Sequence, residues 1–131
     1  MPKYSEKSKE NLSQCNEKLQ MVFNKVVEYY DCTIIKGHRN QEEQHRAFLS
    51  GNSKLDWPHG KHNRTPSDAC DAAPYPVNYS DIKGLHFFAG FVIAIALSMG
   101  VKLRWGGDWD GDFDLKDNKF NDLVHFETID N

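Results

Sequence analysis

Six histidines and nineteen carboxylates give this sequence the means to hold a divalent metal ion. Three of these groups stand where a strand or loop could present them at one point: His62, Asp71 and His125. Two imidazoles and one carboxylate are a known ligand set for catalytic zinc, with the fourth tetrahedral position left for water. Zinc so held polarises a carbonyl oxygen and activates water for hydrolysis. Spacing alone leaves a second interpretation open, a set of polar loop residues around one buried histidine.

A hydrolytic site also needs a proton acceptor that is not a metal ligand, and a cation for the developing oxyanion. Asp122 lies three residues before His125 and is placed to accept the proton. Arg39 lies in "KGHRNQEEQ", at an expected turn from strand to helix, and is placed to hold the oxyanion.

The elements expected to position these residues alternate irregularly between helix and strand. Apolar residues at helical spacing predict an amphipathic helix over about 5–30, and a β-branched segment predicts a strand over 32–37. Asn40 is a suitable N-cap for a helix that Gly51 ends. Residues 52–68 are polar and contain two prolines, so they predict a long loop of the kind that often carries function.

The second half of the chain predicts one long helix among short strands. Ser80 is placed to cap a helix that runs to about Ser98 and ends at Gly100. A loop rich in Gly and Asp is expected over 106–121. Strands are predicted over three short segments, 68–74, 101–105 and 123–127. This order predicts an α+β fold, with a small, mostly antiparallel sheet packed against two or three helices.

Composition excludes several classes of protein. A chain of 131 residues with 39% hydrophobic and 27% charged residues predicts one folded domain, residues 1–131. A net charge of −3 gives no basic footprint for nucleic acid. Three widely spaced cysteines argue against a disulfide framework. The most apolar stretch, 85–100, is too short to span a bilayer, and the polar N-terminal residues predict no secretory signal peptide.

Four motifs occur in an order that resembles a known family: "KGHRNQEEQ", "KHNRTPSDACDAAPYP", "LRWGGDWD" and "DLVHFE". Together they resemble the small zinc peptidases that cut peptidoglycan stem peptides. That group includes D-alanyl-D-alanine carboxypeptidases and dipeptidases and the L-alanyl-D-glutamate peptidases of phage endolysins. The resemblance covers about residues 33–128, is nearest to the short phage enzymes, and implies a fold like that of hedgehog proteins and DD-peptidases.

The resemblance implies a role for each matching position. His62, Asp71 and His125 match the family's three zinc ligands, Asp122 its catalytic acid/base, and Arg39 the arginine that stabilises the tetrahedral intermediate. Two departures bear on the first ligand. Gly60 stands where the family's turn has Ser, and "NRTP" lengthens the spacing between the histidine and the aspartate. His59 is therefore an alternative, although "KHN" leads directly into "PSDACDAAP" and favours His62.

Other residues carry open alternatives. Trp105 and Trp109 flank "GGD" and could line a substrate cleft, or Trp105 could serve the core. Glu127 shares a strand face with His125, and could orient that ligand or be solvated. Alternating aspartates in "DWDGDFDLKD" are consistent with a Ca²⁺ loop or a solvated acidic turn. The aspartates of that candidate loop are Asp108, Asp110, Asp112 and Asp114.

These observations predict a zinc-dependent enzyme that hydrolyses a bond in peptidoglycan stem peptides. The resemblance favours a phage endolysin acting on L-alanyl-D-glutamate, with a D-alanyl-D-alanine carboxypeptidase as the alternative. A non-catalytic peptidoglycan-binding relative and a metal-storage protein are two further hypotheses. We expect a monomer that binds peptidoglycan, is made in the host bacterial cytoplasm, and acts on the cell wall after release.

Overall fold

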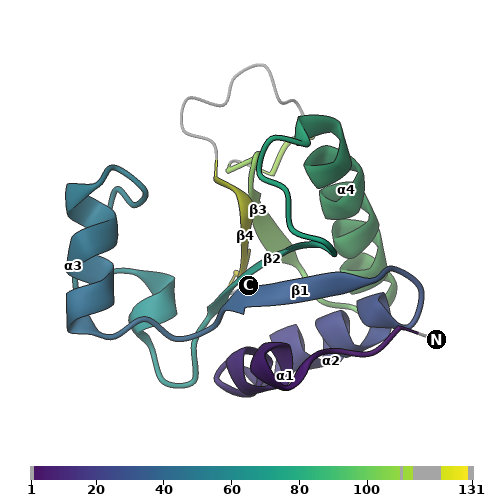
Figure 1. The fold of residues 1–131 in the computed structure, drawn as a ribbon, viewed down its shortest axis with the longest axis horizontal. Helices are drawn as coiled ribbons and strands as arrows, with labels where there is room; N and C mark the ends of the chain where they lie inside the picture. Colours follow the sequence, from purple (N-terminus) through teal and green to yellow (C-terminus); the bar gives the residue numbers. More distant parts are fainter. Residues whose placement is uncertain (1, 110, 114–121, 130–131) are drawn as a thin grey trace.

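Four antiparallel strands form the centre of the protein, in the order β1-β2-β4-β3 (Figure 1). The structure is a computed structural model that describes residues 2–109, 111–113 and 122–129. The strands are β1 (Cys32–Lys36), β2 (Ala69–Pro74), β3 (Leu103–Gly106) and β4 (Asp122–Thr128). The expected α+β class and the mostly antiparallel sheet are confirmed. The two strands that carry Asp71 and His125 lie together in the middle of the sheet.

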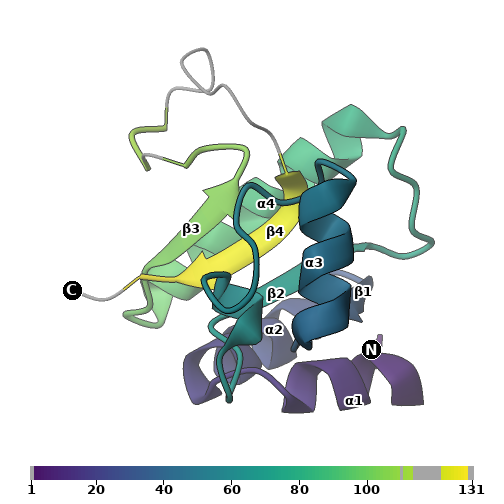
Figure 2. The same cartoon turned by 90° about the vertical axis from the view of Figure 1, so that its left-hand side faces the viewer.

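Helices cover the two faces of the sheet unequally (Figure 2). Behind it lie α2 (Glu17–Val27), which contacts β4, and α4 (Ile82–Ser98), which contacts β2, β3 and β4. Phe23, Phe88 and Phe126 are fully buried between these layers and pack edge to face. On the other face lie α3 (Gln41–Leu49) and the short 3₁₀ helix η1 (Lys61–Asn63). α3 and η1 cover this second face of the sheet, and the candidate site lies on it.

The N-terminal segment forms two helices, so the prediction of one helix over about 5–30 is wrong. α1 (Glu6–Ser13) ends at Gln14, and Asn16 caps α2 by accepting the Leu19 N–H. Between the two helices the chain pairs with Ser67. The Ser67 N–H donates to the Gln14 carbonyl and the Asn16 N–H donates to the Ser67 carbonyl, both at 2.8 Å. This contact with a distant loop outweighs the helical periodicity and breaks the helix.

The other predicted helix and strand boundaries hold with small shifts, whereas much of the loop expected over 106–121 lies outside the described residues. Asn40 caps α3 in a capping box with Glu43, as expected of the N-cap. α4 is capped by Asp81 rather than Ser80, because the Asp81 carboxylate accepts the Gly84 N–H at 3.1 Å. No helix among the described residues is long and apolar enough to cross a bilayer.

Candidate active site

Asp71, His125 and His62 meet on the open face of the sheet. Asp71 and His125 are direct partners in the antiparallel pairing of β2 with β4. η1 brings His62 to the same point from the long loop. His62 Nε2 lies 3.2 Å from Asp71 Oδ1 and 3.2 Å from His125 Nδ1, and the third pair is 3.4 Å apart. Elements 63 residues apart in sequence thus place three ligand-type atoms in one triangle.

This triangle has the dimensions of three ligands around one small cation. Nitrogen and oxygen ligands about 2.0–2.1 Å from a tetrahedral zinc are separated from one another by about 3.4 Å. The three measured separations agree with that value within 0.2 Å. Within the part of the chain that the structure describes, these three residues are the only such group of His, Cys, Asp or Glu side chains. The donor set and its spacing therefore fit a zinc ion.

The outer nitrogen of each imidazole is held by an acceptor. His62 Nδ1–H donates to the Gly37 carbonyl at 2.6 Å, and His125 Nε2–H donates to Glu127 Oε1 at 2.8 Å. These bonds leave the lone pairs of His62 Nε2 and His125 Nδ1 facing the triangle. Of the two interpretations of Glu127, the structure supports orientation of His125, because Glu127 is buried rather than solvated.

The backbone of Gly37 packs closely against α1. A Cβ atom at Gly37 would lie 2.2 Å from the Asn11 backbone oxygen. Asn11 Nδ2 also donates to the Ile34 carbonyl at 2.8 Å, which holds α1 against β1. The backbone acceptor of His62 is therefore backed by the first helix.

Strand alternation places Asp71 on the site face. Its neighbours Cys70 and Ala72 point into the core and are fully buried, as expected of small core residues. Burial of the Asp71 carboxylate would raise its pKa, but the imidazoles of His62 and His125 lower that pKa well below its usual range. Asp71 is thus an anionic oxygen donor before any cation arrives.

Burial alone would lower the pKa of His125. Its hydrogen bonds to Asp71 and Glu127 outweigh burial and raise that pKa to about 9 in the metal-free protein. Glu127 shows the reciprocal effect. Burial opposes its charge, yet the hydrogen bond from His125 lowers its pKa. A cation that binds here must therefore displace a proton from this pair.

His59 does not join the triangle. It is exposed and lines the rim of the cavity above the site, whereas His62 is 2% exposed at its floor. The geometry therefore favours His62 over His59 as the first ligand.

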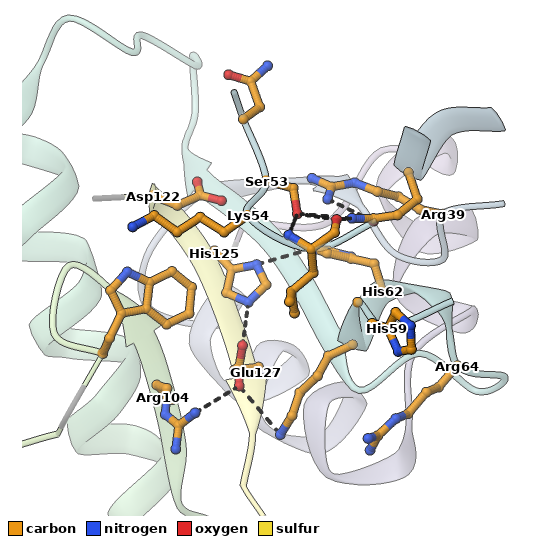
Figure 3. Close-up of a pocket in the computed structure, with 16 residues that line it drawn as sticks. Arg39, Ser53, Lys54, His59, His62, Arg64, Arg104, Asp122, His125 and Glu127 are labelled. Carbon is orange, nitrogen blue, oxygen red and sulfur yellow. Dashed lines mark hydrogen bonds and ion pairs between the residues drawn. The ribbon is translucent and has the colours of Figure 1, made fainter. Parts of the chain in front are cut away.

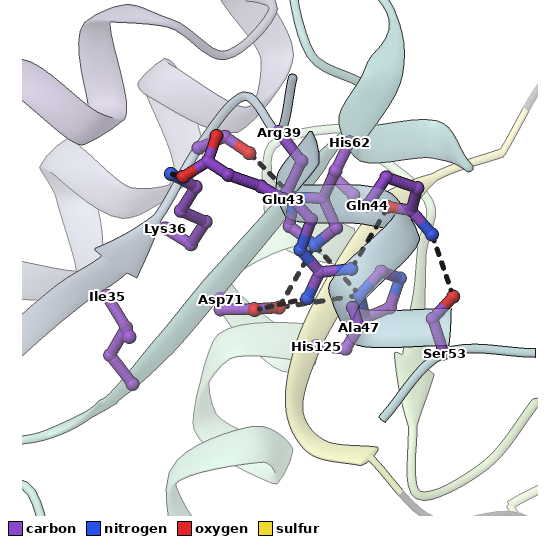
Figure 4. Close-up of polar contacts among 12 residues, drawn as sticks. Ile35, Lys36, Arg39, Glu43, Gln44, Ala47, Ser53, His62, Asp71 and His125 are labelled. Carbon is purple, nitrogen blue, oxygen red and sulfur yellow. Dashed lines mark hydrogen bonds and ion pairs between the residues drawn. The ribbon is translucent and has the colours of Figure 1, made fainter. Parts of the chain in front are cut away.

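Arg39 lies directly beside the triangle (Figure 4). Its Nη2 is 3.4 Å from Asp71 Oδ2, and its Nη1 donates to Gln44 Oε1 at 3.3 Å. Gln44 is itself 1% exposed and donates through Nε2 to Ser53 Oγ at 2.9 Å. These contacts hold the guanidinium over the site. The sequence did not single out Gln44 as a functional residue. The one feature that could have indicated it is its position one turn into α3, a helix that begins next to Arg39.

Asp122 begins β4 and lines the same cavity as His125 and Arg39 (Figure 3). Burial raises the pKa of Asp122, and the Asp71 carboxylate raises it further. A carboxylate with a raised pKa accepts and returns a proton more readily near neutral pH. Asp122 is absent from the triangle, as a proton carrier should be.

The cavity above these residues has a volume of about 620 Å³. Trp109 forms part of its wall, and its ring centroid lies 5.3 Å from that of His125. Trp105 takes the alternative core role. It is 4% exposed, donates its indole N–H to the Leu123 carbonyl at 2.9 Å, and packs within the main core. Of the two predicted roles for Trp105, the structure therefore favours the one in the core over the one in the wall of the cavity.

The candidate calcium loop falls partly outside the described residues, because Asp110 and Asp114 are not among them. Asp108 is buried and accepts the Phe113 N–H at 2.9 Å, whereas Asp112 is exposed. The two described aspartates belong to no group of ligands. Calcium binding gains no support from this geometry.

Three matches among known proteins bear on the identity of this chain. A model of the family "Phage L-alanyl-D-glutamate peptidase" matches residues 1–129. The L-alanyl-D-glutamate peptidase of Escherichia phage T5 is 28% identical over 120 residues, which cover 88% of this chain and 87% of that protein. The crystal structure of the Serratia marcescens L-Ala D-Glu endopeptidase ChiX covers 97% of this chain and 90% of its own, with a TM-score of 0.75. At 21% identity, the last likeness shows the fold alone.

Proposed function

Because the chain belongs to the phage L-alanyl-D-glutamate peptidase family, we propose that it is a zinc-dependent endopeptidase of bacterial peptidoglycan. The bond cut is the one between L-alanine and D-glutamate in the stem peptide, as the name of the phage T5 relative states for that protein. The observation that carries the zinc dependence is the triangle of His62, Asp71 and His125, with all three separations between 3.2 and 3.4 Å. Hydrolysis of a peptide bond is the chemistry that such a ligand set serves.

His62, Asp71 and His125 would hold the zinc ion, which when bound supplies Lewis acidity toward the scissile carbonyl and lowers the pKa of water. Asp122 accepts the proton of the attacking water and then donates it to the departing amine of D-glutamate. The raised pKa of Asp122 suits it to both transfers. One side chain therefore serves as base and then as acid.

Arg39 donates hydrogen bonds to the oxygen on which negative charge develops. Gln44 and Asp71 fix its guanidinium on one side, so the position needs little reorganisation during the reaction. Glu127 keeps His125 in the tautomer that presents Nδ1 to the metal.

The enzyme would be made in the cytoplasm of the host bacterium and would reach the wall after release, as an endolysin. The similarity to the peptidase of a bacteriophage supports this location. It would act there on peptidoglycan as a single zinc peptidase domain.

Mass analysis of peptidoglycan fragments tests the proposal. Purified peptidoglycan treated with the zinc-loaded protein should yield new fragments with a free amine on D-glutamate and a free carboxyl on L-alanine. A chelator should abolish their formation, and added zinc should restore it. Release of terminal D-alanine would instead identify a carboxypeptidase. A zinc-loaded protein that binds peptidoglycan and releases neither product would be a binding protein.

A further inference from the structure

The cavity over the candidate site carries an excess of positive charge, although the whole chain has a net charge of −3. Five cationic side chains line it: Arg39, Lys54, Lys61, Arg64 and Arg104. Two carboxylates, those of Asp122 and Glu127, line the same space. The lining therefore has five positive charges against two negative ones. We refer to Lys54, Lys61, Arg64 and Arg104 as the basic cluster, and Figure 3 labels Lys54, Arg64 and Arg104 among the residues that line the cavity.

A second, smaller cavity meets the first at the reacting groups. It has a volume of about 500 Å³, and Arg39 and Asp122 line both cavities. The smaller cavity is otherwise lined mainly by uncharged side chains, among them Leu85, Leu123 and Val124. None of the basic cluster lines it. Together the two cavities make a groove that is cationic on one side of Arg39 and Asp122 and is lined mainly by uncharged side chains on the other.

The two residues joined by the L-alanyl-D-glutamate bond of the proposed function also differ in charge. L-Alanine, on the carbonyl side, carries only a methyl group. D-Glutamate, on the amine side, keeps one carboxylate free when its other carboxyl group is linked onward along the stem peptide. A carboxylate near a group of cations gains charge-assisted hydrogen bonds.

We propose, on the basis of that function, that the basic cluster binds the free carboxylate of D-glutamate and that Arg104 is its main specificity-determining residue. The alanyl side then lies in the smaller cavity. The groove therefore fixes the direction in which the stem peptide binds, and it selects a substrate whose glutamate carboxylate is ionised.

Arg104 is the member of the basic cluster best placed to meet a ligand. Its side chain is 39% exposed, and its ion pair with Glu127 is loose at 3.5 Å. Lys61 is less exposed, at 21%, and also donates to the Thr128 carbonyl. Arg64 is engaged by Asp68 at 2.7 Å. A guanidinium can also grip a carboxylate through two parallel hydrogen bonds, which a lysine cannot do.

Glu127 connects Arg104 to the metal ligands. One of its oxygens accepts from His125, and the other faces Lys61 at 3.4 Å and Arg104 at 3.5 Å. Arg104 also lies opposite Glu127 in the pairing of β3 with β4. The sheet thus places the proposed carboxylate-binding arginine one side chain away from His125.

The test compares two synthetic substrates that differ in one group. Both contain N-acyl-L-alanyl-D-glutamate linked onward through one carboxyl group, and in one of them the free carboxylate is replaced by a carboxamide. The zinc-loaded enzyme should cleave the carboxylate form with a kcat/KM about 10- to 100-fold higher, the range expected for hydrogen bonds to a charged group. Arg104→Gln, which keeps most of the stem and loses the charge, should lower this preference by about tenfold or more.

The preference ratio distinguishes recognition from structural damage, because damage lowers kcat/KM for both substrates equally. Arg46→Gln is the matched control: Arg46 lies on the exposed side of α3, contacts Glu42 at 4.0 Å, and is not part of either cavity. It should leave the ratio unchanged, and zinc content should be equal in all three proteins. Equal cleavage of both substrates by the unmodified enzyme, or an unchanged ratio in Arg104→Gln, would overturn the inference alone. Failure to cleave either substrate would overturn the proposed function, and this inference with it.

Discussion

Asp71 and His125 are cross-strand partners in the centre of the sheet, and their ligand atoms lie 3.4 Å apart. Backbone hydrogen bonds of β2 and β4 therefore fix two corners of the proposed zinc site. The third corner, His62, comes from a loop, but its ring is tied to the Gly37 carbonyl. A site built in this way is largely formed before the metal binds, and the following predictions depend on that arrangement.

Glu127→Gln should weaken zinc binding about 10- to 100-fold, the usual effect of removing a carboxylate that orients a metal-bound histidine. The neutral amide can still accept from His125 Nε2–H, but it loses the charge that favours this orientation. Competition with a chromophoric chelator would measure the affinity. Glu43→Gln, on α3 and outside both cavities, is the control. Equal zinc affinities in the two variants would contradict the role of Glu127.

Asp122→Asn should keep its zinc and lose about 10²- to 10⁴-fold in kcat, because an amide cannot carry the proton. Metal analysis and peptide cleavage measured on the same sample separate the two properties. Loss of zinc from this variant would instead make Asp122 a metal ligand. Retention of full activity would remove it from the mechanism.

Arg39→Lys should lower kcat about 10²- to 10³-fold and change KM little, because the interaction forms mainly in the transition state. A lysine cannot keep both the contact to Gln44 and the contact to Asp71. Steady-state kinetics on a defined stem peptide would separate the two constants. A rise in KM at constant kcat would show that Arg39 binds the ground state instead.

The metal-free protein should lose stability as the pH rises from about 6.5 toward 9. The pKa of His125 is raised on folding from 6.5 to about 9. A raised pKa means that the folded state holds the proton more tightly, so this stabilisation is complete below pH 6.5 and is lost through pH 9. Urea denaturation in the presence of chelator would measure the decline, and a His125→Gln variant should lack it.

Zinc binding should reverse this trend, because the metal requires His125 without its proton on Nδ1. Calorimetric titrations at pH 7 in buffers of different ionisation enthalpy should detect about one proton released per zinc bound. The absence of proton release would show that His125 is already neutral in the metal-free protein.

Local patterns in the sequence were sufficient to predict the elements that carry Asp71, His125 and Arg39. The β-branched segment correctly marked the strand over 32–36, and Asn40 correctly marked the start of α3. These features are set by residues only a few positions apart in the chain, so they can be predicted from the sequence.

Features set by distant contacts were not predictable in this way. The N-terminal helix breaks because Gln14 and Asn16 pair with Ser67, which no pattern near residue 15 reveals. Gln44 reads as one more polar helix residue until the fold brings Ser53 and Arg39 to it. The five cations around the cavity likewise come together only in the fold, because they lie in η1, in β3 and in three separate loop segments.

The contact between Gly37 and Asn11 has a consequence for protein engineering. The four motifs that carry the family resemblance all lie after residue 32, and a minimal fragment designed from them alone would omit α1 and α2. Such a fragment would lack the helix that supports the carbonyl oriented toward His62. Its proposed zinc site would lose this support, although all three candidate ligands had been retained.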